Sequence, residues 1–276
     1  MTPLRSPVLV AAFEGWNDAG DAATDAVEHL TDVWDADEIA TIDPEDYYDF
    51  QVNRPSVYIA DGETRRISWP TTRFYACAIP GTDRDLVLVR GVEPNMRWRG
   101  FCDELLSTAR DLGVTEVVTL GALLADSPHT RPVPVSGTSS DPALAQRLSL
   151  EPSRYEGPTG IVGVLQEACH RAGLAAVSFW AAVPHYVASP PCPKATVALL
   201  RRVEDLLDVS IPLGDLPAEA RAWERQVDEL ASEDSDVAEY VASLEEREPE
   251  EDLPEASGEA IAAEFERFLR RQGDTG

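Results

Sequence analysis

The chain opens with a hydrophobic run, a polar turn and an amphipathic segment. Residues 7–13 carry Val, Leu, Ala and Phe without polar alternation, which is typical of a strand buried on both faces in the centre of a parallel sheet. Residues 14–20 form the turn, and apolar side chains then recur at helical spacing from Ala23 to Trp34. The pattern predicts a turn at the carboxyl end of the sheet, followed by a helix that covers one face.

The next region is rich in strand patterns. Residues 38–42 are expected to form a short second strand, and the stretch 56–90 contains further short apolar runs separated by tight turns. Asp61-Gly62 is a hairpin signal. This part of the fold is therefore expected to be antiparallel or mixed. Its predicted strands are 57–60, 65–70, 73–79 and 85–90.

Two later segments repeat one pattern, a helix that ends at a glycine and then a strand. Helical spacing over 98–112 and 161–172 ends at Gly113 and Gly173, and a hydrophobic strand follows each. A further helix is expected at 195–207. Helix and strand units in this order predict an α/β fold with a mostly parallel sheet.

Beyond Ile211 the pattern is helical, with three amphipathic stripes and an acidic break at 246–259 before the last stripe, 261–268. The apolar side of each such helix must be buried against another surface, so we expect the extension to pack on the core or on a neighbouring molecule. The expected organisation is an α/β domain over 1–213 and an acidic C-terminal helical extension over 214–276.

The charge of the chain restricts its partners. The formal net charge is −27, which argues against nucleic acid because a polyanion would be repelled at long range. The segment 215–255 holds 16 Asp and Glu against three Arg, so about half of the excess negative charge belongs to the expected extension. There is no apolar run of about 18 residues and no basic region before an apolar stretch at the N-terminus. We therefore expect a cytoplasmic protein with no membrane contact.

The cysteines give no sign of a metal site. Cys77, Cys102, Cys169 and Cys192 are far apart, without a CxxC pair or a histidine at metal spacing. They are expected to be buried thiols, and neither a metal nor a cofactor is predicted.

Charged and aromatic residues gather where the predicted strands end. Arginine and histidine side chains there could hold a carboxylate or a phosphate. Alternatively, Arg90 and Arg131 pair with Glu14, Asp18 or Asp126 and fix the loops. The candidate ligand-binding residues are Glu14, Gly15, Trp16, Asn17, Asp18, Arg90, His129, Arg131 and His185.

Known catalytic and nucleotide motifs are not matched. Gly15 and Gly20 have the spacing of a phosphate loop, but Asp21 and Ala22 stand where Lys and Ser or Thr should be. The glycine-rich stretch 157–163 follows an irregular segment and not a strand, which favours close helix packing over nucleotide binding. There is no GxSxG, HExxH or EF-hand loop. No catalytic residue is assigned.

Two sequence blocks resemble a known family. FEGWNDAGDAA at 13–23 resembles the opening signature of the proteasome assembly chaperone 2 family, and GALLADSPHTRPVPV at 121–135 resembles a hallmark of its prokaryotic members. The resemblance covers roughly 7–210. It implies a three-layer αβα sandwich with a mixed, mostly parallel sheet similar to that of purine nucleoside phosphorylases. The C-terminal hydrophobic-Tyr-any motif of such chaperones is replaced by Asp274-Thr275-Gly276, so docking of the tail on the proteasome α-ring is not expected.

Two functions stay open at this point. The first, which the resemblance implies, is a non-enzymatic oligomeric scaffold or assembly chaperone with proteasome subunits as partners. The oligomer expected from the resemblance is a homotrimer. The second is a small-anion-binding protein or enzyme with a phosphorylase-like site at the strand ends, anchored by Arg90, His129 and Arg131. The missing nucleophile and phosphate loop favour the first.

Overall fold

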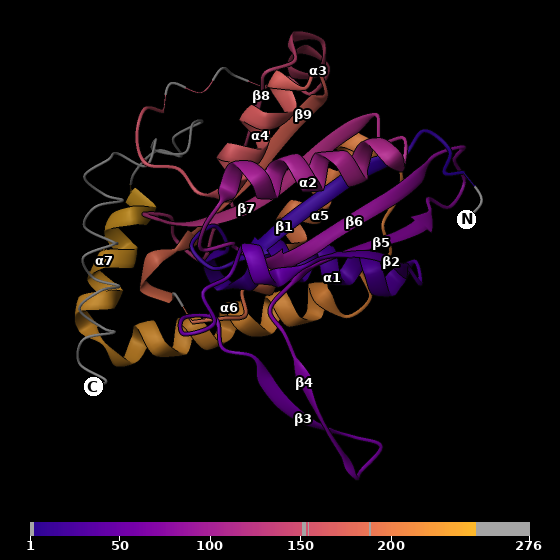
Figure 1. Cartoon of the computed structure of the whole chain (residues 1–276). Coiled ribbons are helices and arrows are strands. Elements are labelled where there is room, and N and C mark those ends of the chain that lie inside the picture. Colours follow the sequence, from indigo (N-terminus) through magenta and orange to yellow (C-terminus); the bar gives the residue numbers. More distant parts are fainter. Residues whose placement is uncertain (1–2, 151–152, 154, 188, 247–276) are drawn as a thin grey trace.

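The computed structural model describes residues 3–150, 153, 155–187 and 189–246, which form a seven-stranded mixed sheet flanked by helices (Figure 1). As predicted, the first hydrophobic run lies at the centre of the sheet. From one edge to the other the strands are β2 (Asp37–Ile42), β5 (Thr72–Ala78), β6 (Asp85–Val92), β1 (Val8–Glu14), β7 (Glu116–Ala125), β9 (Ala175–Pro184) and β8 (Val135–Ser139).

The strands of the sheet run mostly in one direction. β1 pairs in parallel with β6 and β7, and β7 pairs in parallel with β9. β5 and β8 run against their neighbours, so β2, which is antiparallel to β5, points the same way as β1. The expected mixed sheet is confirmed, whereas its likeness to a phosphorylase sheet stays a prediction.

Helices cover both faces of the sheet, as Figure 1 shows. α1 (Ala22–Val33) and α5 (Pro193–Leu207) bury their apolar stripes with Val8, Val10 and Ala12 of β1. α2 (Trp98–Asp111) and α4 (Ile161–Arg171) pack with the alternate β1 side chains, which face the other way. Because both faces of β1 are covered, its sequence shows no polar alternation.

The C-terminal helices begin with α6 (Leu216–Glu233), followed by α7 (Ser235–Glu246). Trp223 and Val227 of α6 are buried in the apolar cluster that contains α1 and α5, so α6 packs on the core, one of the two expected alternatives. The predicted third stripe, 261–268, lies outside the described residues. None of the described helices is long and apolar enough to span a bilayer.

The predicted hairpin forms a separate two-stranded sheet. β3 (Ser56–Ala60) and β4 (Thr64–Ser68) are joined at Asp61-Gly62, where both residues have positive φ, as a tight hairpin turn requires. Figure 1 shows this ribbon extending away from the body of the molecule. The stretch 56–90 therefore divides into a projecting ribbon and two strands of the main sheet.

The sequence pattern does not predict two short elements after β7. β8 has the sequence VSGTS and pairs antiparallel with β9 at the edge of the sheet. The helix α3 (Pro142–Arg147) follows, and Asp141 caps it by accepting from the backbone N of Leu144 at 2.9 Å. Ser, Gly and Thr dilute the strand signal, so pairing with β9 is what makes this segment extended.

Candidate functional site

The turn after β1 lies between the neighbouring strands at the carboxyl end of the sheet. On one side, the backbone N of Glu93 donates to the Glu14 carbonyl oxygen at 2.9 Å. On the other, the backbone N of Ala122 donates to the Asn17 carbonyl oxygen at 2.8 Å. These bonds extend the β6–β1 and β1–β7 ladders into the turn, so its backbone is fixed from both sides. The predicted position of the turn is confirmed.

Asp18 fastens this turn to the start of α1. Its side chain is buried, and its Oδ1 accepts from the backbone N of Ala23 at 2.7 Å and of Thr24 at 3.3 Å. Its Oδ2 accepts from the Thr24 hydroxyl. Burial raises the pKa of Asp18 to about 6, although the hydrogen bonds from Thr24 and Ala23 oppose this shift. The carboxyl group is therefore used to satisfy helix donors.

Asn17 and Glu93 connect the turn to α4. The Asn17 side chain is 1% exposed, and its Nδ2 donates to Glu93 Oε1 at 2.7 Å. The backbone N of Ile161, in the first turn of α4, donates to the same oxygen at 2.8 Å. A Cβ on Gly160 would lie 2.2 Å from Asn17 Oδ1, so this close approach requires glycine. The packing interpretation of the stretch 157–163 agrees with this geometry.

Gly20 brings the same turn against α5. The backbone N of Cys192 donates to the Gly20 carbonyl oxygen at 2.8 Å, and Gly20 has a φ of +63°. A Cβ there would lie 2.7 Å from the Cys192 Cβ. Gly15 also has positive φ, and its carbonyl accepts from the backbone N of Asp18 at 3.1 Å. Trp16, between them, remains 43% exposed.

Arg90 of β6 is paired with acids of its own chain. Its Nη1 lies 2.9 Å from Glu28 Oε2 on α1, and its Nη2 lies 3.7 Å from Glu14 Oε1. The expected alternative, in which Arg90 fixes a loop through Glu14, agrees with this geometry. Arg90 thus belongs with the turn after β1, in a first group of candidate residues.

His129 is at the centre of a second group, in the loop after β7. Its backbone N donates to Tyr186 Oη at 2.7 Å, and its Nδ1 lies 2.8 Å from the same oxygen. Its Nε2 lies 3.0 Å from Asp228 Oδ1 on α6. If the Tyr186 hydroxyl donates to Nδ1, Nε2 donates to Asp228, which is the bonding pattern of a neutral imidazole. The His129 ring is buried and fully engaged.

Lys194, the only lysine of the chain, adds to this group from the first turn of α5. Its Nζ donates to the His129 carbonyl oxygen and lies 3.2 Å from Glu224 Oε1 of α6. One cation therefore ties the loop after β7 to two helices. A partly buried ion pair of this kind is screened less by salt than a surface pair.

Arg131 and His185 lie under α7. The Arg131 guanidinium donates to the Glu245 carbonyl oxygen, and the Thr130 hydroxyl donates to Glu245 Oε1 at 2.5 Å. The His185 ring meets the ring of Tyr240 edge-on at 5.2 Å, and its Nδ1 lies 3.4 Å from Asp126 Oδ1. The structure thus brings His129, Arg131 and His185 together beneath the C-terminal helices, and ligand binding by them stays a prediction.

The sequence did not indicate the partners that complete these two groups. Glu93 comes from the loop after β6, and Tyr186 directly follows the predicted candidate His185. Asp228 lies 99 residues beyond His129 along the chain. A spacing pattern could not reveal these pairs. The sequence places Tyr186 at the strand ends beside His185 but does not reveal its bond to His129; the missed residues are Glu93, Lys194, Glu224 and Asp228.

The thiols are placed largely as expected. Cys102, Cys169 and Cys192 are buried, whereas Cys77 is half-buried. Burial raises the pKa of Cys102 and Cys169 to about 12 and that of Cys77 and Cys192 to about 11. Among the described residues, no group of three or more His, Cys, Asp or Glu could hold a metal ion.

Comparison with known proteins gives consistent matches. The sequence model of the PAC2 family matches residues 12–231. A PAC2 family protein from Streptomyces avermitilis is 65% identical, with a TM-score of 0.81, over 85% of this chain and 99% of that one. A proteasome-assembly chaperone homologue from Mycobacterium tuberculosis is 64% identical, with a TM-score of 0.78 and the same coverage.

More distant structures share the fold alone. PbaB of Pyrococcus furiosus, described as an archaeal proteasome activator, is 18% identical with a TM-score of 0.66 over 82% of this chain and 94% of that one. Among proteins with curated descriptions, none matches this chain significantly.

Proposed function

The chain belongs to the PAC2 family, and from this premise we propose that it is a non-enzymatic, homo-oligomeric scaffold that assists the assembly of proteasome subunits. The relative from Mycobacterium tuberculosis, 64% identical, is a proteasome-assembly chaperone homologue, and this similarity supports the choice of partner. A trimer is the proposed stoichiometry.

The observation that carries the non-enzymatic part is that most polar groups at the strand ends are bonded within the chain, although Asn17 Oδ1, Arg90 Nε and His185 Nδ1 have no hydrogen-bond partner among the described residues. Asp18 bonds the start of α1, and Glu93 joins Asn17 to α4. Arg90 is paired with two carboxylates, and the His129 ring contacts Tyr186 and Asp228. A small anion would have to displace Glu14 and Glu28 from Arg90, or the helix α6 from His129. This arrangement favours a protein-binding role over the small-anion alternative.

The partner is tested by mixing the full chain with purified proteasome α and β subunits. We expect co-elution in size-exclusion chromatography and faster formation of half-proteasomes on native gels. Since the chain has a net charge of −27, the binding is repeated at several salt concentrations, because association through charge alone weakens steeply with salt. Absence of both co-elution and acceleration in low and high salt contradicts the proposed partner.

The non-enzymatic part is tested separately. We expect no phosphate-dependent cleavage of nucleosides by the full chain. Cleavage that is lost in Arg90→Ala would overturn this part of the proposal and favour the small-anion alternative.

A further inference from the structure

The β3–β4 ribbon has an apolar face that no other described segment of its own chain covers. Val57 pairs with Ile67 and Ile59 pairs with Arg65 across the two strands. Directly paired residues lie on the same face of a ribbon, so Val57, Ile59 and Ile67 share one face with Arg65. These three apolar side chains are 54%, 58% and 54% exposed, which is unusual for β-branched residues gathered on one face.

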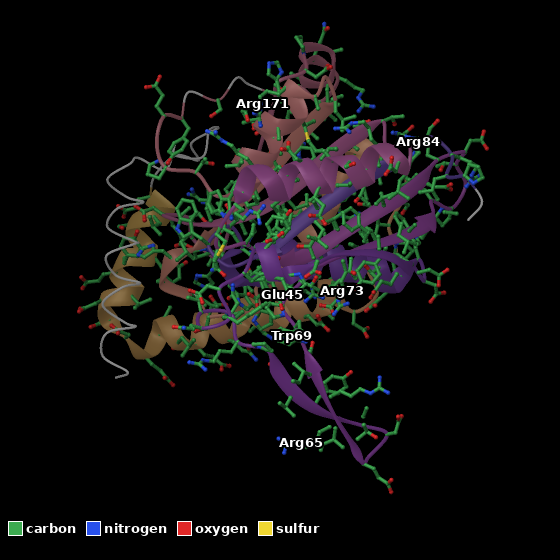
Figure 2. All side chains as sticks on the ribbon, in the orientation of Figure 1. Glu45, Arg65, Trp69, Arg73, Arg84 and Arg171 are labelled. Carbon is green, nitrogen blue, oxygen red and sulfur yellow. The ribbon has the colours of Figure 1, made fainter. Side chains whose placement is uncertain are left out.

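The position of the ribbon explains this exposure. In Figure 2, Arg65 lies far out on the ribbon, and Trp69 lies where the ribbon joins the body. At this base, Phe50 and Trp69 meet edge-on at 4.9 Å. A two-stranded ribbon is at best marginally stable in water without a further packing partner. The ribbon therefore gains most from a surface that covers its apolar face.

A receiving surface of matching chemistry lies where α6 meets α7. A groove of about 340 Å³ is lined there by Tyr186, Val187, Val227, Leu230, Ala231, Glu233, Asp234 and Val237. Most of these lining residues are apolar, and Leu230 is 60% exposed. Glu233 and Asp234 add negative charge. The groove therefore offers apolar surface to Val57, Ile59 and Ile67, and carboxylates to Arg65.

We propose that the ribbon of one copy of this chain docks in the α6–α7 groove of a neighbouring copy. A second copy fits because both halves of the contact are present in the same sequence, and in Figure 1 the ribbon points away from the α6–α7 junction of its own chain. The ribbon carries Arg65 and Arg66 against Asp61 and Glu63, so it has no net charge in a chain with a net charge of −27. Its Arg65 is the group that meets the carboxylates of Glu233 and Asp234 in the groove.

This contact joins two different surfaces, so it is heterologous, and such contacts close into rings when the rotation between copies allows it. The inference rests on the homo-oligomeric state in the proposed function and assigns it a surface. It also explains why Leu230, which lies beside Val227 on α6 but remains 60% exposed, is apolar.

The docking is tested by disulfide cross-linking of the full chain. In Ile67→Cys/Leu230→Cys, both new thiols are exposed, whereas the native cysteines are buried or half-buried. After mild oxidation, we expect a ladder of cross-linked copies on a non-reducing gel. The matched control is Met96→Cys/Leu230→Cys, since Met96 is also exposed, at 42%, but lies off the ribbon; this control should remain largely monomeric on the gel.

Light scattering of the untreated wild-type chain accompanies the gel, because it distinguishes a failure of the ribbon docking from a failure of the proposed oligomer. If the wild type is oligomeric but Ile67→Cys/Leu230→Cys gives no ladder, the ribbon docking is overturned and the proposed oligomer stays intact. This is also the result expected if residues of the same chain beyond Glu246 fill the groove. A wild-type mass of 30.1 kDa overturns the oligomer itself.

A charge exchange gives an independent result. Arg65→Glu should increase the dissociation constant of the oligomer about tenfold by placing like charges together. Adding Glu233→Arg to the same chain should restore most of the affinity; Glu233 lines the groove, whereas Asp234 is kept because it accepts from the backbone N of Asp236 and Val237 at the start of α7. If the double variant is as dissociated as Arg65→Glu, the α6–α7 groove is not the receiving surface.

Discussion

The carboxyl end of the sheet and the β3–β4 ribbon differ in where their side chains find partners. In the turn after β1, Asn17 and Asp18 are 1% and 4% exposed, and their side chains bond other elements of the same chain. On the ribbon, Val57 and Ile67 are more than half exposed. The turn after β1 therefore stabilises the fold of its own chain, whereas the β3–β4 ribbon exposes apolar surface to which another molecule can bind.

This comparison predicts that substitutions in the turn reduce stability and that substitutions on the ribbon alter assembly. The largest loss is expected for Asp18→Ala, which leaves the buried backbone donors of Ala23 and Thr24 without a partner. We expect the free energy of unfolding to fall by about 3 kcal/mol, measured by chemical denaturation. The control Asp103→Ala, at an exposed position of α2, should change it by less than about 0.5 kcal/mol. Equal losses in both variants would contradict the fastening role of Asp18.

A loss of about 2 kcal/mol is expected for Gly160→Ala, because the new Cβ would meet Asn17 Oδ1 at 2.2 Å and push the turn away from α4. The control is Gly100→Ala in α2, where the nearest atom, Tyr47 Cε1, would be 3.8 Å away. Alanine favours the helix over glycine by about 1 kcal/mol, so this control should be neutral or stabilising. A stable Gly160→Ala chain would show that the turn and α4 are not tightly joined.

A smaller effect, about 1 kcal/mol, is expected for Asp228→Ala, which removes the carboxylate partner of His129 Nε2. Asp228 is partly exposed, so water can replace some of the lost bonding. Limited proteolysis should then cut α6 faster than in the wild type. The neighbouring variant Glu229→Ala, also at an exposed position, should leave the cleavage rate unchanged, and similar rates for all three chains would contradict the anchoring of α6 by His129.

The smallest change at neutral pH is expected for Asp18→Asn, which keeps an oxygen acceptor for the α1 donors. Burial raises the pKa of Asp18 to about 6 in the folded chain, above about 4 in the unfolded chain. The folded state therefore holds this proton more tightly, so the contribution of protonation at Asp18 to stability is complete below pH 4 and is lost as the pH rises through 6. The hydrogen bonds of Asp18 to α1 are a separate contribution.

The free energy of unfolding should accordingly fall less steeply between pH 4 and pH 7 in Asp18→Asn than in the wild type. Asp25, whose pKa burial also raises to about 6, is retained and leaves part of the slope. Parallel pH profiles for the two chains would contradict the assignment to Asp18.

Much of the fold follows from hydrophobic periodicity. The central strand β1, the helix and strand units that end at Gly113 and Gly173, and the Asp61-Gly62 hairpin are all present as predicted. β8 could not be predicted because its five residues, VSGTS, become extended by pairing with β9. Local pattern fails where tertiary pairing decides the conformation.

The candidate site could be predicted only in part. The sequence placed Glu14, Arg90 and His129 at strand ends, because the ends of hydrophobic runs can be read directly. It could not divide them into two groups, since that depends on α6 folding back over the loop after β7 to place Asp228 against His129. Nor could it show that Glu93 is shared by Asn17 and α4.

The central claim is that the strand ends hold each copy together while the ribbon joins copies, and the most direct measurement is the mass of two chains by light scattering at micromolar concentration. We predict that the wild type has a multiple of 30.1 kDa, about 90 kDa for a trimer. Ile59→Ser/Ile67→Ser should have the mass of one chain with an unchanged circular dichroism spectrum. Equal masses for the two chains would contradict the claim.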